Sequence, residues 1–233
     1  MTNGEMDKLL SSRPVPPLPA DRLKQIEAAV VADLKPVRPL APAGVYLAAF
    51  AAIVIAGCLA SWFYFTGQSG WEALSNLQKI LVFVPLCSIA ALLIFSVVRQ
   101  MTPAAKYART TALFAAAVFL LLLVFMTLLF RPVQESAFIS TGLICLRNGM
   151  TFAIPVAFVF ALLLLRGAQL SPLLTGATAG GLAGLVGMAV LEIHCPNLNI
   201  YHILVWHVSV VLVCVIGGTV LSSVTFRRRI PNR

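Results

Sequence analysis

Long apolar blocks separated by short polar segments make up most of the chain after residue 42. Six of them are long enough to cross a bilayer, because about 20 apolar residues span a hydrocarbon core roughly 30 Å thick; they are 44–66, 78–98, 109–130, 148–165, 172–193 and 203–224. Lipid offers the backbone no hydrogen-bond partners, so each block is predicted to be helical. None alternates with a period of two, as membrane β-strands do. The pattern therefore predicts an all-α, polytopic membrane protein with six transmembrane helices.

The first 42 residues form a separate segment that is polar and rich in proline. Within it, Leu23, Ile26, Val30 and Leu34 follow one another at steps of three, four and four, which places them in one stripe along a helix. So short a helix is not stable alone in water, and its stripe needs a surface to cover. The lipid headgroup layer, the protein's own loops and the groove of a partner protein are the three candidates for that surface.

Composition and charge support this interpretation and orient the chain. Of the 233 residues, 60% are hydrophobic and 11% are charged, whereas an ordinary soluble domain is about 25% charged. A compact soluble fold is excluded, because polar residues are too few to cover its surface. With the N-terminus inside, only Lys79, Arg131 and Arg147 of the 17 basic residues fall outside. The positive-inside rule then places both termini in the cytoplasm.

The predicted organisation has three parts: a cytoplasmic tail over 1–42, a six-helix transmembrane domain over 43–226 and a basic cytoplasmic C-terminus over 227–233. The run Arg227–Arg229 is expected at the lipid headgroups. No direct contact with nucleic acid is predicted, because no aromatic residues interleave a longer basic stretch. Gly176, Gly180 and Gly184 form a small-residue face, which suits close helix contact within the chain or, alternatively, in a homodimer.

Two of the five cysteines stand apart from the predicted spans. Cys145 and Cys195 are expected in two loops on the same outer face, whereas the other three lie inside spans and are expected to act as small hydrophobic residues. Two thiols on one face can form a disulfide, bind a soft metal or stay separate. His194 precedes Cys195 directly, so Cys145, Cys195 and His194 are a candidate metal site.

The other two histidines and the missing motifs complete the list of candidates. His202 and His207 are five residues apart at the start of the sixth span, and on an α-helix they are expected to point in different directions. The sequence contains no Walker loop, Rossmann fingerprint, Ser/His/Asp order or HExxH motif, which are the usual signatures of catalysis. We therefore expect a protein that is not an enzyme and has no resident cofactor.

Several segments resemble one family. Asp33–Leu40, Gly142–Gly149 around Cys145, Arg166–Pro172 and His194–Pro196 are similar to the NrsF-type anti-sigma factors, six-span bacterial regulators of extracytoplasmic-function sigma factors. The likeness extends over roughly 33–225. It implies a multi-pass protein of the bacterial inner membrane whose tail binds such a sigma factor.

The resemblance also implies a mechanism. Leu23, Ile26, Val30 and Leu34 would anchor the sigma factor, and Cys145 and Cys195 would sense heavy metals or oxidants, with a heavy-metal ion held transiently at the cysteines. Two alternatives come from other classes of protein. A small metal transporter or permease would use the cysteines and His194 to take up metal. A membrane thiol oxidoreductase would cycle the two cysteines, although the absence of a CxxC pair counts against it.

Overall fold

The structure is a computed structural model, and it describes residues 19–33, 41–65, 69–101, 108–167 and 171–229. Every regular element within these ranges is helical, and none of the described residues lies in a strand. The chain forms two units, residues 1–39 and 40–233, and each is described by itself. The all-α prediction is confirmed.

In the first unit, helix α2 (Ala20–Asp33) carries the predicted apolar stripe. It starts where the backbone N–H groups of Arg22 and Leu23 both donate to the carbonyl oxygen of Pro19, at 2.9 and 3.1 Å. Leu23, Ile26 and Val30 lie within about 60° of one another around the helix axis. Each is more than half exposed within this unit. Leu34, the fourth predicted anchor, lies outside the described residues.

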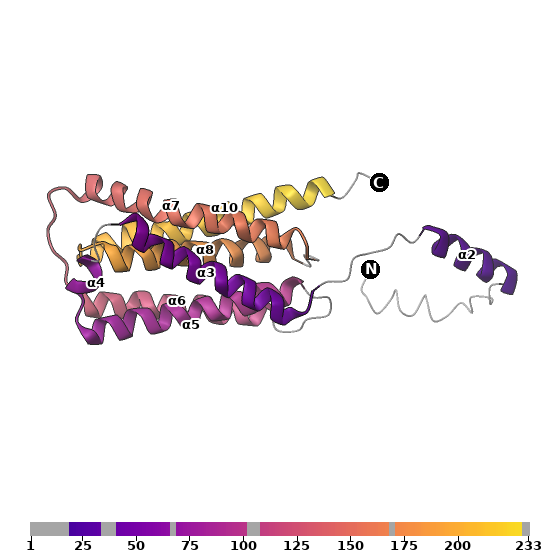
Figure 1. Cartoon of the computed structure of the whole chain (residues 1–233), viewed down its shortest axis with the longest axis horizontal. Coiled ribbons are helices and arrows are strands. Elements are labelled where there is room, and N and C mark those ends of the chain that lie inside the picture. The colour runs from indigo at the N-terminus through magenta and orange to yellow at the C-terminus, as the bar shows by residue number, and fades with distance from the viewer. Residues whose placement is uncertain (1–18, 34–40, 66–68, 102–107, 168–170, 230–233) are drawn as a thin grey trace, which may run out of the picture. The chain divides into compact units, whose positions relative to one another are not determined.

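Among its described residues, the second unit contains six bundled helices that are long and apolar enough to cross a membrane (Figure 1). The predicted spans are therefore confirmed, and the protein is a multi-pass membrane protein. The first five are α3 (Ala43–Tyr64), α5 (Asn76–Met101), α6 (Ala108–Leu129), α7 (Phe138–Leu164) and α8 (Pro172–His194). The sixth span, Ile200–Thr225, comprises α9 (Ile200–His202), the π-helix η1 (Ile203–His207) and most of α10 (Val208–Arg229), and the short helix α4 (Ser69–Ala73) follows α3.

Helix α8 is the central helix of the bundle. Of its most apolar window, 78% is buried, compared with 11–33% in the other five spans. Its glycine face lies against α10: a Cβ atom on Gly184 would be 2.6 Å from the Cα atom of Val211, and one on Gly180 would overlap the carbonyl of Cys214. The small-residue stripe is thus used within the chain, where it brings two backbones together.

Helix α7 begins ten residues before the predicted start of the fourth span. The hydroxyl groups of Ser140 and Thr141 both donate to the carbonyl oxygen of Ala137, at 3.1 and 2.8 Å. Polar residues that satisfy themselves locally in this way can continue a helix that hydropathy alone does not detect. The prediction that Cys145 lies in a loop is therefore wrong, because it lies inside α7.

A buried polar cluster ties the first turns of α8 to the end of α5. The side-chain amide nitrogen of Gln100 donates to the hydroxyl oxygens of Ser96 and Thr178, at 3.1 and 3.3 Å. Its amide oxygen accepts from the hydroxyl group of Thr175 at 2.9 Å. Ser96 in turn donates to the carbonyl oxygen of Ala108 at 2.8 Å. We call these residues the glutamine cluster, and each of its side-chain polar atoms has a partner.

Candidate functional site: a thiol–imidazole cluster

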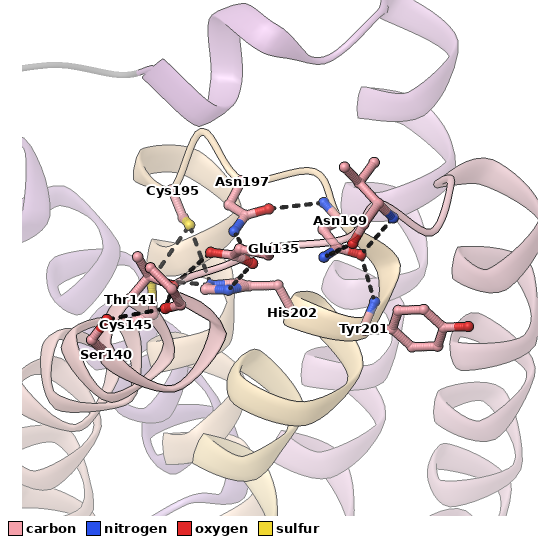
Figure 2. Close-up of polar contacts among 11 residues, drawn as sticks. Glu135, Ser140, Thr141, Cys145, Cys195, Asn197, Asn199, Tyr201 and His202 are labelled. Atoms are coloured by element: carbon pink, nitrogen blue, oxygen red, sulfur yellow. Dashed lines mark hydrogen bonds and ion pairs between the residues drawn. The ribbon is translucent and has the colours of Figure 1, made fainter.

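Two short connections meet at one end of the bundle, and Asn199 joins them. Its side-chain nitrogen donates to the carbonyl oxygen of Val133 at 2.8 Å, and its side-chain oxygen accepts from the backbone N–H of Val133 at 3.2 Å. The same oxygen accepts from the backbone N–H of Tyr201 at 3.2 Å and so caps α9. Residues near 133 and 199 are therefore held in a fixed register, and Figure 2 shows the polar contacts around this junction.

The two predicted sensing cysteines lie together at this end. The Sγ atoms of Cys145 and Cys195 are 3.4 Å apart, and both residues are free thiols. The Nε2 atom of His202 is 3.3 Å from the sulfur of Cys145 and 3.8 Å from that of Cys195 (Figure 2). A disulfide bond is about 2.05 Å long, so the thiols are in contact and not bonded.

The π-helix η1 brings the second histidine to the same side. The backbone N–H of Val208 donates to the carbonyl oxygen of Ile203, five residues earlier. In an α-helix, residues five apart are about 140° apart around the axis, whereas this wider turn stacks them. The rings of His202 and His207 accordingly lie 5.5 Å apart. The prediction that these histidines diverge is wrong, because it assumed an α-helix.

Each of these histidines has a carboxylate behind it. The Nδ1 atom of His207 is 2.8 Å from Oε1 of Glu192, and both side chains are at most 2% exposed. The Nδ1 atom of His202 is 3.7 Å from Oε2 of Glu135. Ionisable groups at the edge of a bilayer are costly to bury and therefore mark functional sites.

Hydrogen bonds and burial shift the pKa values of Glu135 and Cys195, which lie in the two connections. The hydroxyl group of Thr141 donates to Glu135 at 2.6 Å, and the side-chain amide of Asn197 donates to it at 3.0 Å. These two bonds hold the pKa of Glu135 below its ordinary value. The hydrogen bond with Cys145 and burial both raise the pKa of the Cys195 thiol. The resting site therefore combines a thiol that keeps its proton with a carboxylate that stays ionised.

Three buried nitrogen atoms at this site have no hydrogen-bond partner among the described residues: His202 Nδ1, Trp206 Nε1 and His207 Nε2. Buried polar atoms normally have partners, so unpaired ones need an explanation. The Trp206 ring occupies the space that a side chain at position 142 would fill, since a Cβ atom on Gly142 would overlap it. Gly142 thus permits α7 to approach η1.

His194, the predicted third ligand, lies elsewhere. Its Nε2 atom is 3.0 Å from the hydroxyl oxygen of Ser61, and its ring stacks on Phe65 with centroids 4.5 Å apart. The residues that the structure brings together instead are Cys145, Cys195, His202 and His207, which offer ligand atoms within 4.8 Å of one another. We call these four side chains the thiol–imidazole cluster.

Sequence reasoning missed the two glutamates of this site, although the sequence holds a signal for them. Five of the eight acidic residues lie in the tail, which leaves Glu72, Glu135 and Glu192 for the whole transmembrane unit. Two of these three support the cluster's histidines. Adjacent thiols can be oxidised to a disulfide or can bind a soft metal with imidazole help. The arrangement therefore suits thiol chemistry at a membrane surface.

Comparison with known proteins gives one match. A family model described as NrsF, negative regulator of sigma F, matches residues 30–227. This range includes the last four residues of α2, all six spans and every residue of the thiol–imidazole cluster. No curated protein and no solved structure matches the chain.

Proposed function

The chain belongs to the NrsF family of negative regulators of sigma F, and from this premise we propose that it sequesters an extracytoplasmic-function sigma factor at the bacterial inner membrane. Release follows heavy-metal or oxidative stress, which the thiols of Cys145 and Cys195 sense on the periplasmic side. Both termini, and therefore α2, lie in the cytoplasm. The activity is binding and release, so it requires no catalytic residue.

The exposed stripe of α2 supports the partner-binding half of this proposal. Leu23, Ile26 and Val30 form one apolar face on a helix that has 14 residues. Amphipathic helices bind grooves through anchors at this spacing. Fully burying one such side chain contributes about 1.5–3 kcal/mol. Three or four anchors, with Leu34 as the fourth, would contribute roughly 4.5–12 kcal/mol before the cost of ordering the helix is subtracted.

The observation that carries the sensing half is the 3.4 Å contact between the sulfurs of Cys145 and Cys195. An oxidant that accepts two electrons would convert this pair to a disulfide and release two protons. A soft metal ion would displace the same protons and bridge the sulfurs. Either change pulls α7 and the end of α8 together, because the two cysteines belong to these two elements.

Only a small free energy is needed for disulfide formation or metal binding at the cysteines to release the sigma factor. A tenfold loss of affinity corresponds to about 1.4 kcal/mol. A signal shifts a conformational equilibrium by the difference in its interaction with the two states. The buried helix α8 connects Cys195 to the opposite end of the bundle, so the two states would differ in the position of α8.

One experiment tests the sensing half. In cells that carry a reporter gene read by the partner sigma factor, the Cys145→Ser/Cys195→Ser double variant is expected to lose induction by Cd²⁺ and by oxidants. The Cys58→Ser/Cys87→Ser double variant is the matched control, because these cysteines lie inside α3 and α5 and neither belongs to the thiol–imidazole cluster. Full induction of the first variant, at normal protein level, would refute sensing by this pair.

A second experiment tests the binding half. Leu23→Asp/Ile26→Asp is expected to leave the reporter switched on without stress, because charge on the stripe prevents burial of α2. Gln25→Asp/Ala32→Asp adds the same charge on the opposite side of α2 and is expected to keep the reporter off. Equal repression by both variants would exclude the stripe as the binding face.

A further inference from the structure

We propose that the thiol–imidazole cluster is a four-coordinate binding site for a soft or borderline divalent cation, of which Zn²⁺ and Cd²⁺ are examples. The ligands are Cys145, Cys195, His202 and His207. Glu192 is a positioning residue that accepts a hydrogen bond from Nδ1 of His207, and Glu135 lies 3.7 Å from Nδ1 of His202. The proposal names the ligand class of the sensing site and rests on the proposed function for its biological role.

The geometry is close to that of a tetrahedral site. Zn–S and Zn–N bonds of about 2.3 and 2.0–2.1 Å place neighbouring ligand atoms about 3.3–3.8 Å apart. The Sγ–Sγ distance of 3.4 Å and the two sulfur-to-His202 distances of 3.3 and 3.8 Å already lie in this range. All four ligand atoms lie within 4.8 Å of one another. Small side-chain rotations therefore complete the site.

The donor set selects the metal class. Two thiols and two imidazoles form the Cys₂His₂ set that is characteristic of tetrahedral zinc sites. Hard cations such as Mg²⁺ and Ca²⁺ require oxygen ligands. Glu192 is engaged by His207, and Glu135 accepts hydrogen bonds from Thr141 and Asn197. The ligand atoms that remain are sulfur and nitrogen.

The buried pair of His207 and Glu192 supplies the second and independent observation. The Nδ1 atom of His207 lies 2.8 Å from the carboxylate, so it carries the proton and donates it. The Nε2 atom then keeps its lone pair, and it is buried without a hydrogen-bond partner among the described residues. Metal-binding histidines are usually held in this way, with the far nitrogen on a carboxylate and the near one on the metal.

His202 lies at the edge of the site, and its Nδ1 atom has no hydrogen-bond partner among the described residues. Its Nε2 atom faces both sulfurs, and its Nδ1 atom lies 3.7 Å from Glu135. Glu135 also lines a hollow of about 560 Å³ together with Asn197, Asn199 and Arg131. The side chain of Glu135 therefore lies between this hollow and His202. None of the four ligands lines this hollow, so a cation that enters here would have to pass Glu135 to reach them.

Charge balances when the cation binds. Each thiol gives up its proton to water, and the two thiolates neutralise the two positive charges of the metal. The imidazoles bind as neutral ligands, and the metal keeps its oxidation state throughout. The metal-loaded cluster adds no net charge to a region where α7, α8 and η1 exclude water.

Binding of Cd²⁺ alone to the full-length protein tests the proposal. The protein is purified in detergent, reduced, and freed of metal with a chelator. Titration is expected to show one Cd²⁺ per chain and the ultraviolet charge-transfer absorption of thiolate–cadmium bonds. His202→Ala and His207→Ala should each weaken binding at least tenfold. His194→Ala is the matched control and should bind within twofold of the unaltered protein, because His194 contacts Ser61 instead.

Two further variants separate a loss of ligand from a loss of fold. His202→Cys replaces one soft ligand with another and should retain binding. Glu192→Leu removes the carboxylate behind His207 and should weaken binding about 10–100-fold, whereas Glu192→Gln keeps an acceptor oxygen and should lose less. The proposal is overturned if folded His202→Ala and His207→Ala proteins bind Cd²⁺ as tightly as the unaltered chain. It is also overturned if the reduced, folded protein binds no Cd²⁺.

The failure of this proposal is distinguishable from that of the proposed function. If purified protein ignores Cd²⁺ but the reporter still depends on both cysteines, the metal site is wrong and thiol sensing stands. If Cd²⁺ binds with the expected ligands but the reporter ignores both the cysteines and the α2 stripe, the metal site stands and the anti-sigma mechanism is wrong.

Discussion

Helix α8 carries a buried polar cluster near each of its ends, and the two clusters differ in how completely their atoms are paired. In the glutamine cluster, Gln100 uses both amide hydrogens and its oxygen within the protein. In the thiol–imidazole cluster, ring nitrogens of His202 and His207 are buried without hydrogen-bond partners among the described residues. Thr175 of the glutamine cluster and Glu192, which contacts His207 of the thiol–imidazole cluster, are 17 residues apart, or about 26 Å along the helix.

This difference separates a structural cluster from a binding site. A fully paired polar network fixes one arrangement of its helices, and nothing is left over to recognise a ligand. An incompletely paired network carries a cost that a suitable ligand can remove. We therefore expect substitutions in the glutamine cluster to change stability alone. Substitutions in the thiol–imidazole cluster should change ligand binding as well.

The largest effect is expected from Glu192→Leu. The variant leaves the buried Nδ1–H of His207 without its acceptor, so the metal-free protein should lose about 3 kcal/mol of unfolding free energy. Unfolding in detergent, followed by circular dichroism, measures the loss. The Glu192→Leu/His207→Leu double variant is the control and should recover most of it. Additive losses in the double variant would show that the pair is not energetically coupled.

Gly142→Ala is expected to have the next largest effect. The added Cβ atom would overlap the ring of Trp206, so α7 and η1 must separate at a cost of about 2 kcal/mol. Cd²⁺ binding should weaken too, because η1 carries His207 away from the sulfurs. Gly44→Ala is a suitable control, since a Cβ atom there meets nothing within 4 Å. If the Gly142→Ala protein is destabilised but binds Cd²⁺ with unchanged affinity, the contact between Gly142 and Trp206 does not determine the position of His207.

Gln100→Leu is expected to cost about 1–2 kcal/mol of unfolding free energy. It removes the shared partner of Thr175 and Thr178, but both hydroxyl groups keep a backbone carbonyl four residues earlier as acceptor. Single hydrogen bonds between membrane helices are also weak. Affinity for Cd²⁺ should be the same as in the unaltered chain. A drop in Cd²⁺ affinity would mean that the two clusters are coupled along α8.

The smallest effect concerns pH and Glu135→Gln. Because the pKa of Glu135 is lowered in the folded protein, its stabilising contribution is present above its ordinary pKa of about 4.5 and is lost as the pH falls through the lowered value. The unaltered protein should therefore exceed the variant in stability at neutral pH, by less than about 1 kcal/mol. The difference should vanish in acid. A stability difference between the two proteins that grows in acid would contradict a lowered pKa of Glu135.

The fold was largely predictable from the sequence because hydropathy measures what a membrane helix needs. The predicted span 172–193 differs from α8 (Pro172–His194) by one residue. The start of α7 was missed because Ser140 and Thr141 look like loop residues to a hydropathy scale, although their hydroxyl groups bond to their own helix. Such local pairing is invisible until the backbone conformation is known.

The site was only half predictable. Cys145 and Cys195 could be chosen because they lie near span ends on one predicted face. The convergence of His202 and His207 depends on one π turn, which no composition or spacing rule specifies. The assignment of His194 as a ligand followed from its position beside Cys195, yet the C-terminal end of α8 directs its ring to Ser61 and Phe65. Neighbours in sequence at a helix end point in different directions.

The glycine face between α8 and α10 has a mechanical consequence. Where side chains separate two helices, rotation of those side chains absorbs a small displacement before it reaches the next helix. At Gly180 and Gly184 the main chains of α8 and α10 are in direct contact, and dense interiors transmit strain. We therefore expect the two helices to move together, so that a displacement at one membrane surface is transmitted along both of them to the other.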